Sequence, residues 1–178
     1  CFLDQEAIVS QLVLGNGASI RSTVRLAKGA NLIAGESPGG VKTWSAIGYD
    51  SPSTMIMHTG AIFSTAGHLW IGFKGVGQSV LFISGGTVNV AGQFGLGWNG
   101  GAGRVDLRGG QLNLAHIDST QSIGATSVIE IESGRLSISG NYEAVIKDLI
   151  SVGLVTTHSR DRTLIIAYDG SKTTVTAE

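Results

Sequence analysis

The chain has 178 residues, enough for one sizeable hydrophobic core but short for two. Only 14% of residues are charged, the formal net charge is −1, and the Lys and Arg residues are scattered singly. This excludes the electrostatic footprint expected of a protein that binds nucleic acid or a membrane surface. With 27 glycines and 2 prolines, the composition favours short strands separated by tight turns. No apolar run reaches the roughly 18 residues that a membrane-spanning helix needs.

The single cysteine, Cys1, excludes a disulfide within the chain. No signal peptide is recognisable, which is expected of a mature form or an excised domain. Two interpretations of Cys1 stay open: a lipid-bearing residue left by lipoprotein processing, or a domain boundary that falls at a cysteine.

In chain order, residues 1–12 contain apolar residues without helical capping signals, which predicts a lead-in strand. Residues 24–35 form the first predicted strand–turn–strand unit, and residues 36–43 (ESPGGVKT) read as a turn-like insert. Three sharper strand–glycine–strand units follow: VLFISGGTVNV, RVDLRGGQLNL and VIEIESGRLSI.

Two series of glycines recur with a period near 24 residues. The spacings in the first series are 33, 24, 25 and 27 residues, between Gly15, Gly48, Gly72, Gly97 and Gly124. The spacings in the second are 31, 26, 24 and 24, between Gly29, Gly60, Gly86, Gly110 and Gly134. The insert at 36–43 explains the first long interval. Internal repeats of this length predict an array of stacked units.

Alternation along the strands separates two faces, because successive side chains point to opposite sides. The aliphatic set is expected inside: Leu81, Ile83, Val88, Val90, Val105, Leu107, Leu112, Leu114, Ile129, Ile131, Leu136 and Ile138. The polar set is expected to face water: Thr87, Asn89, Asp106, Arg108, Gln111, Asn113, Glu130 and Glu132. Aligned from unit to unit, the pattern predicts an all-β fold, a single-stranded parallel β-solenoid (β-helix). It should be right-handed and have about five coils of ~24 residues.

Residues 1–140 are expected to form the coils, and residues 141–178 to cap the last coil within the same domain. The segment NYEAVIKDLISVG predicts a helix with Asn141 as its N-cap, and the segments TLIIAYDG and TTVTA follow as strand and tail. A cap is required because the last coil would otherwise expose its apolar cross-section and an unpaired edge.

Few residues of the chain are candidates for catalysis, metal binding or cofactor binding. No nucleophile arrangement, phosphate-binding loop or metal-type histidine spacing is recognisable, so we expect no catalytic residue, no metal ligand and no cofactor. A metal site between His68 and His116, two coils apart, is an alternative. Glu130 and Glu132 are a candidate glycosidase pair, although Asp106 and Arg108 beneath them favour a solvated salt-bridge ladder.

The aromatic residues flank the glycines of TWSAIGY, HLWIGF and FGLGWNG. Alternation places Tyr49, Phe73 and Trp98 on the core side with Ile47, Ile71 and Leu96. It places Trp44 and Trp70 on the outer face, over a strip made of Ala46, Gly48, Gly72, Gly95 and Gly97. A flat strip bordered by tryptophan suits a sugar ring stacked on indole. Two alternatives remain: the glycines relieve crowding where the coils bend, or a bulge beside the glycine swaps the faces and exposes Trp98.

On this interpretation, the chain binds polysaccharide through six residues: Trp70, Trp44, Trp98, His68, Asn99 and Gln93. Neither a nucleic-acid partner nor a membrane span is expected.

The ordered segments WSAIGY, GHLWIGF, LFISGGTVNVAGQFGLGWNGGAGRVDLRGGQLNL, ISGN and YDGSKTTVTA, from about residue 44 to 176, resemble a known repeat domain. It is a glycine-rich β-solenoid toward the C-terminus of large secreted proteins of marine and environmental bacteria, often with polysaccharide-degrading modules. The shorter units are also similar to the strand repeats of autotransporter passengers. The resemblance implies a secreted or cell-surface, non-catalytic module that grips polysaccharide and is tethered to a catalytic domain. Two alternatives remain, a structural or adhesive self-assembling solenoid and a polysaccharide lyase or glycoside hydrolase.

Overall fold

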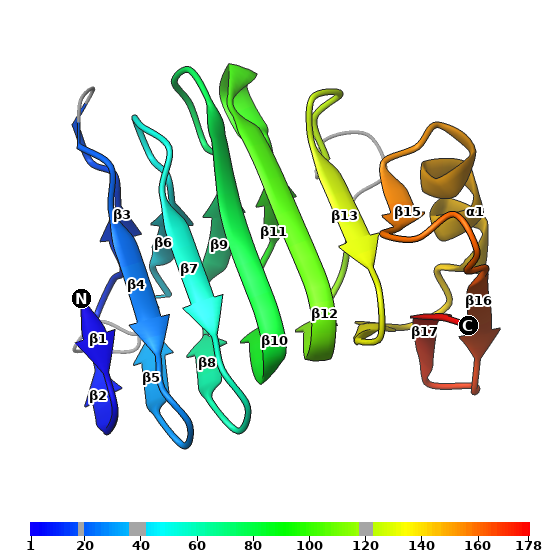
Figure 1. The fold of residues 1–178 in the computed structure, drawn as a ribbon, viewed down its shortest axis with the longest axis horizontal. Coiled ribbons are helices and arrows are strands. Elements are labelled where there is room, and N and C mark those ends of the chain that lie inside the picture. Colours follow the sequence, from blue (N-terminus) through cyan, green and yellow to red (C-terminus); the bar gives the residue numbers. More distant parts are fainter. Residues whose placement is uncertain (18–19, 36–41, 118–122) are drawn as a thin grey trace.

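The structure is a computed structural model that describes residues 1–17, 20–35, 42–117 and 123–178. The chain winds into a β-solenoid of about six turns, with 52% of the described residues in strands or β-bridges (Figure 1). This confirms the predicted fold class and adds one turn to the expected five. The additional turn consists of β1 (Phe2–Leu3), β2 (Glu6–Ile8) and β3 (Val13–Leu14), in place of the single lead-in strand expected there. The predicted insert at 36–43 falls mostly outside the described residues.

The turns build three legs, and within each leg the strands of successive turns pair in parallel. Among the described residues, four turns contribute a strand to the third leg. After β1, the first leg contains β4 (Thr23–Leu26), β7 (Thr54–Met57), the first halves of β10 (Gln78–Val90) and β12 (Ala102–Leu114), β13 (Val128–Ile131) and β15 (Val155–Thr157). After β2, the second leg contains β5 (Asn31–Ala34), β8 (Ile62–Thr65), the second halves of β10 and β12, and β14 (Arg135–Ser139). The third leg is a separate four-stranded sheet of β3, β6 (Trp44–Ile47), β9 (His68–Ile71) and β11 (Phe94–Leu96).

The glycine pairs do not form the turns that the sequence predicts between the first and second legs. β10 and β12 each continue through their glycine pair as one strand of 13 residues. The register between them shifts where the pairs lie, between Ile83 and Thr87 of β10. A side chain on Gly86 would meet the backbone carbonyls of Ala61 and His58 in the preceding turn. The glycines therefore permit a shallow bend against a closely packed neighbour.

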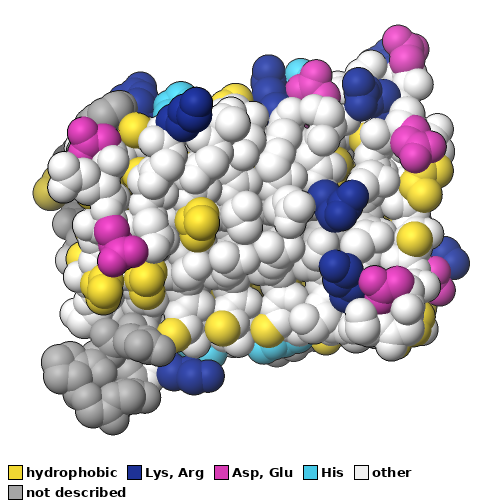
Figure 2. Space-filling view, turned by 90° about the horizontal axis from the view of Figure 1, so that it is seen from below, with side chains coloured by type: hydrophobic (Ala, Val, Ile, Leu, Met, Phe, Trp, Pro, Cys, Tyr) yellow, Lys and Arg dark blue, Asp and Glu magenta, His cyan; other side chains and the backbone are white. Residues whose placement is uncertain are grey.

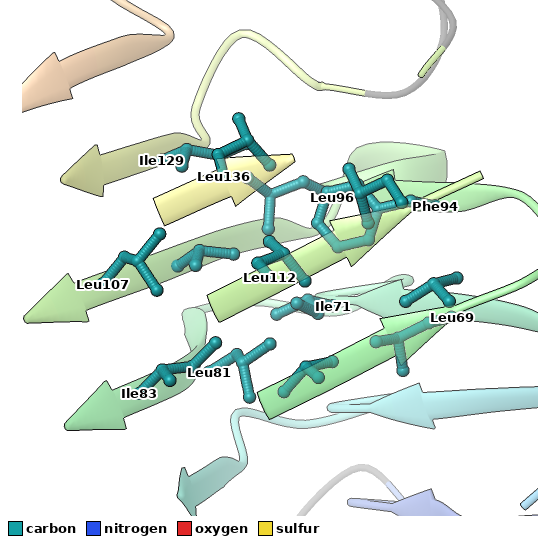
Figure 3. Close-up of a cluster of buried hydrophobic side chains, with 14 of the residues drawn as sticks. Leu69, Ile71, Leu81, Ile83, Phe94, Leu96, Leu107, Leu112, Ile129 and Leu136 are labelled. Atoms are coloured by element: carbon teal, nitrogen blue, oxygen red, sulfur yellow. The ribbon is translucent and has the colours of Figure 1, made fainter. Parts of the chain in front are cut away.

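The interior consists mainly of aliphatic ladders that run along the solenoid axis, with Phe94 packed among them (Figure 3). Leu81 pairs with Val105 and Val105 with Ile129, so each ladder repeats one position from turn to turn. All twelve aliphatic residues of the set predicted to face the core are buried: Leu81, Ile83, Val88, Val90, Val105, Leu107, Leu112, Leu114, Ile129, Ile131, Leu136 and Ile138. Alternation within straight strands thus predicted the core correctly.

The C-terminal segment covers the end of the stack, as expected. Helix α1 (Glu143–Ser151) places Ile146 and Leu149 in the core, and its N-cap position is Tyr142, one residue later than predicted. Asn141 still helps to cap the start of the helix, because its side-chain oxygen accepts a hydrogen bond from the backbone N–H of Glu143 at 3.2 Å.

The strands that follow the helix also cover the end of the stack. β15 pairs in parallel with β13, and β17 (Lys172–Ala177) pairs antiparallel with β14 and then with β16 (Leu164–Tyr168). In the turn of this hairpin, Asp169 accepts the backbone N–H of Lys172 and both the hydroxyl and the backbone N–H of Ser171, which lowers its pKa to about 2. No helix among the described residues has the length and apolar character needed to cross a membrane.

Replacing Leu107 by Ala should lower the free energy of unfolding by about 2–5 kcal/mol, because the side chain is fully buried in the central ladder. Denaturant unfolding followed by circular dichroism measures this change. Gln111→Ala, an exposed position of the same strand, is the control and should stay within about 0.5 kcal/mol of the unmodified chain. A loss below about 0.5 kcal/mol for Leu107→Ala would contradict the core assignment.

Deleting residues 141–178 should make the protein self-associate, because the edges of β13 and β14 lose the strands that pair with them. Size-exclusion chromatography with light scattering should then detect oligomers or aggregates. A monomeric truncation with an unchanged thermal midpoint would show that the cap is dispensable.

Candidate functional site

The third leg ends at a glycine corner in four successive turns. Gly15, Gly48, Gly72 and Gly97 have φ values of 67°, 78°, 68° and 71°, in the left-handed region that other residues rarely adopt. This conformation interrupts the alternation of the strand, so the next side chain does not return to the core. The predicted core-side position of Tyr49, Phe73 and Trp98 is therefore wrong, and all three lie on the outer side with Trp44 and Trp70.

The expected open strip of glycines is also wrong. The corner glycines are buried against neighbouring chain: a side chain on Gly72 would clash with the carbonyl of Ala102. Gly95 lies one strand from Trp70 in the register, and a Cβ there would collide with the indole ring. These glycines relieve steric crowding, as the alternative interpretation held, and Trp70 occupies the space above Gly95.

Six side chains enclose a hollow of about 370 Å³ on the outer face of the third leg, here called the aromatic hollow. The volume lies within the usual range for sites that bind small ligands. Five of the rings are aromatic residues and the sixth is an imidazole: Trp44, Tyr49, His68, Trp70, Phe73 and Trp98. All three tryptophans of the chain thus meet in one place.

One wall of the aromatic hollow is a stack of nearly parallel rings. The ring centroids of Trp44 and Tyr49 are 5.2 Å apart with planes inclined by 21°. Those of Tyr49 and Phe73, on successive turns, are 5.1 Å apart with planes inclined by 6°. This spacing follows the separation of about 4.8 Å between parallel strands. The repeat of the solenoid therefore builds the stack.

The other wall is formed by Trp70 and Trp98, whose ring centroids are 5.0 Å apart at an angle of 42°. Trp70 meets the edge of Phe73 at 61°, which joins the two walls. Trp70 is the most buried of the six, with 8% of its surface exposed, whereas Trp44 and Trp98 are half-buried. Trp44 and Trp98 are therefore the indoles that a ligand can reach.

The other three predicted site residues differ in whether they line the aromatic hollow. His68 lines the hollow, and its Nδ1 accepts the backbone N–H of Gln93 at 2.8 Å. Gln93 thus orients the imidazole through its backbone. Asn99 is exposed in the short 3₁₀ turn η1 (Trp98–Gly100) with a φ of 51°, and it is not one of the six lining residues.

A salt bridge between Lys74 and Asp50 lies beside the stacked wall of the hollow. The Lys74 Nζ lies 3.0 Å from a carboxylate oxygen of Asp50 and 4.6 Å from the centroid of the Tyr49 ring. The hydrogen bond to Asp50 raises the pKa of the lysine ammonium. Sequence reasoning missed Tyr49, Phe73, Lys74 and Asp50 as members of the site. The available signal was the aromatic residue that follows the corner glycine in three consecutive repeats.

The candidate acid pair lies on a different face, on the outer side of the first leg. Asp106 is in register with Glu130, as predicted, and Arg108 Nε is 3.8 Å from Glu132. Arg104 binds Glu130 at 2.7 Å, and both arginines contact Asp106. Asp106 is 5% exposed, not solvated as expected, because Arg104 and Arg108 lie against it. The charges form the predicted salt-bridge ladder.

Within the described part of the chain, no group of three or more His, Cys, Asp or Glu side chains is arranged to hold a metal ion. Comparisons with protein-family models, with characterised proteins and with solved structures find no match for this chain.

Replacing Gly95 by Ala should displace the Trp70 ring, because the new Cβ has no space beside it. We expect a shift in tryptophan fluorescence and a lower thermal midpoint. Gly29→Ala is the matched control: its φ of 80° strains the backbone, but the added Cβ touches nothing within 4 Å. It should lower stability without changing the fluorescence spectrum of the folded protein. An unchanged spectrum for Gly95→Ala would contradict the placement of Trp70.

Proposed function

We propose that the chain is a non-catalytic carbohydrate-binding module, which holds an extracellular or cell-wall polysaccharide by stacking sugar rings in the aromatic hollow. The observation that carries the proposal is the gathering of five aromatic side chains and His68 around one open hollow. Aromatic rings offer a sugar a flat apolar face, and their N–H and O–H groups offer hydrogen bonds at the edges. Secretion, and a tether to a catalytic domain in a larger protein, belong to the same proposal.

The direction of the hollow supports binding of an extended chain. Its rings come from three consecutive turns, within β6 and β9 and at the corners that follow β6, β9 and β11. Neighbouring strands lie about 4.8 Å apart, close to the length of one pyranose unit at roughly 5 Å. A polysaccharide that runs along the solenoid axis would therefore meet chemically similar rings at successive units.

A second candidate function, a structural or adhesive surface solenoid, is favoured by the outer face of the second leg. Asn113 donates to Asn89 at 2.9 Å, and Asn89 donates to Ser64 at 3.0 Å. These side chains hydrogen-bond along the stack and reinforce the contact between turns. Figure 2 shows the molecule from below, with most of the middle of this surface free of charged side chains. A neutral, regular face of this kind suits packing against another surface.

Trp98→Ala and Trp44→Ala should each weaken retention on a polysaccharide gel more than tenfold, since loss of a well-used indole costs about 2 kcal/mol. Affinity electrophoresis through neutral and sulfated algal polysaccharides measures the retention. The thermal midpoints should change little because both rings are half-buried. Trp70→Ala is unsuitable for this test, because its buried ring makes loss of folding the expected outcome.

Phe82→Ala is the matched control. This aromatic residue lies on the outer face of the first leg beneath Arg108, away from the aromatic hollow, and its removal should leave retention unchanged. Because the three tryptophans line the hollow, oligosaccharide binding should also alter intrinsic fluorescence. If the unmodified chain binds no glycan, the proposal fails and the adhesive function takes its place.

A further inference from the structure

A polar ladder runs beside the stacked wall of the aromatic hollow. The backbone N–H of Phe73 donates to the carbonyl of Gly48 at 2.9 Å, and that of Lys74 donates to the carbonyl of Tyr49 at 3.0 Å. These bonds align the two corners residue by residue. Lys74 therefore lies next to Asp50, as Phe73 lies next to Tyr49. The ion pair is fixed to the rim of the hollow by the same register that stacks the rings.

The hydrogen-bonding groups of the hollow are mostly donors. None of the six lining residues carries a carboxylate. The two indoles that a ligand can reach, Trp44 and Trp98, can only donate. The Nδ1 of His68 accepts the N–H of Gln93, so the neutral imidazole carries its proton on Nε2 and donates from that atom. A ligand that satisfies these groups needs acceptor oxygens.

Lys74 adds a positive charge whose present partner is easily exchanged. Its side chain is 41% exposed and that of Asp50 is 25% exposed. Ion pairs with this access to water contribute little to stability, so a ligand anion can replace the carboxylate at small cost. The Tyr49 ring, 4.6 Å from Nζ, holds the ammonium at the rim during such an exchange.

We propose, building on the proposed function, that the aromatic hollow selects an anionic polysaccharide and that Lys74 is the specificity-determining residue. The sugar rings stack in the hollow, and a sulfate ester or a uronate carboxylate takes the place of Asp50 at the Lys74 ammonium. Asp50 holds the lysine in position while the site is empty. The two possible sources of the anion share this chemistry and are separated by the test.

The test is affinity electrophoresis of the unmodified chain at low salt in gels that contain carrageenan (a sulfated galactan), alginate (a uronate polymer) or agarose (an uncharged galactan). Retention should be at least tenfold stronger on carrageenan or alginate than on agarose, and it should fall as salt is added. The preferred gel identifies sulfate or carboxylate as the anion. Equal retention on agarose would overturn this inference and leave the proposed function standing. Retention on none of the three would remove the proposed function itself.

Three variants test whether Lys74 is responsible for the preference for an anionic polysaccharide. Lys74→Gln should lower retention on the preferred anionic gel at least fivefold, and Asp50→Asn, which frees the lysine, should raise it. Lys28→Gln removes an exposed lysine from the turn between β4 and β5 and should stay within twofold of the unmodified chain. A Lys74→Gln variant within twofold of the unmodified chain, an equal loss in Lys28→Gln, or weaker binding by Asp50→Asn would each overturn the assignment. Unchanged thermal midpoints confirm that the variants are folded.

Discussion

Each turn of this solenoid has to change direction where the neighbouring turn leaves no space for a side chain. The corners after the third leg meet this constraint with a glycine in the left-handed conformation, at Gly48, Gly72 and Gly97. The same conformation sends the following aromatic residue outward. The aromatic hollow is thus a consequence of how the backbone turns, and the rings stack because the corners themselves are stacked. Fold and candidate site share one cause.

The straight parts of the chain were predictable and the corners were not. Leu107 and Ile131 could be assigned to the core because a strand alternates strictly, and the register of Asp106 with Glu130 followed from the 24-residue period. Alternation failed at Tyr49, because the left-handed glycine before it changes the direction of the next side chain. No sequence pattern states the φ of a glycine, so the side on which an aromatic residue emerges requires the structure. Because the backbone conformation of a glycine cannot be read from the sequence, Gly85 and Gly86 were also assigned to a turn, although β10 continues through them.

The candidate site was partly predictable, for chemical reasons. Trp44 and Trp98 are two of only three tryptophans in the chain, and both lie close to a corner glycine of the repeat, which made them candidates. The burial of Trp70 depends on Gly95 in the next strand, a relation that is visible only once the register is known. The ion pair of Lys74 and Asp50 likewise joins residues of two turns. Contacts between turns could be predicted within the regular strands, as for Asp106 and Glu130, but not at the corners.

Because successive turns place their rings at equivalent positions, such a site can change during evolution in a simple way. Trp44, His68 and Gln93 occupy equivalent positions of successive turns, as do Tyr49, Phe73 and Trp98. Duplication of one turn would insert a complete row of side chains while leaving the interior ladders continuous, because each turn contacts mainly its neighbours. The binding surface would lengthen by a fixed step of about 4.8 Å. Gene segments of about 24 codons would then be the natural unit of variation, and the length of the recognised polymer could change without redesign of the fold.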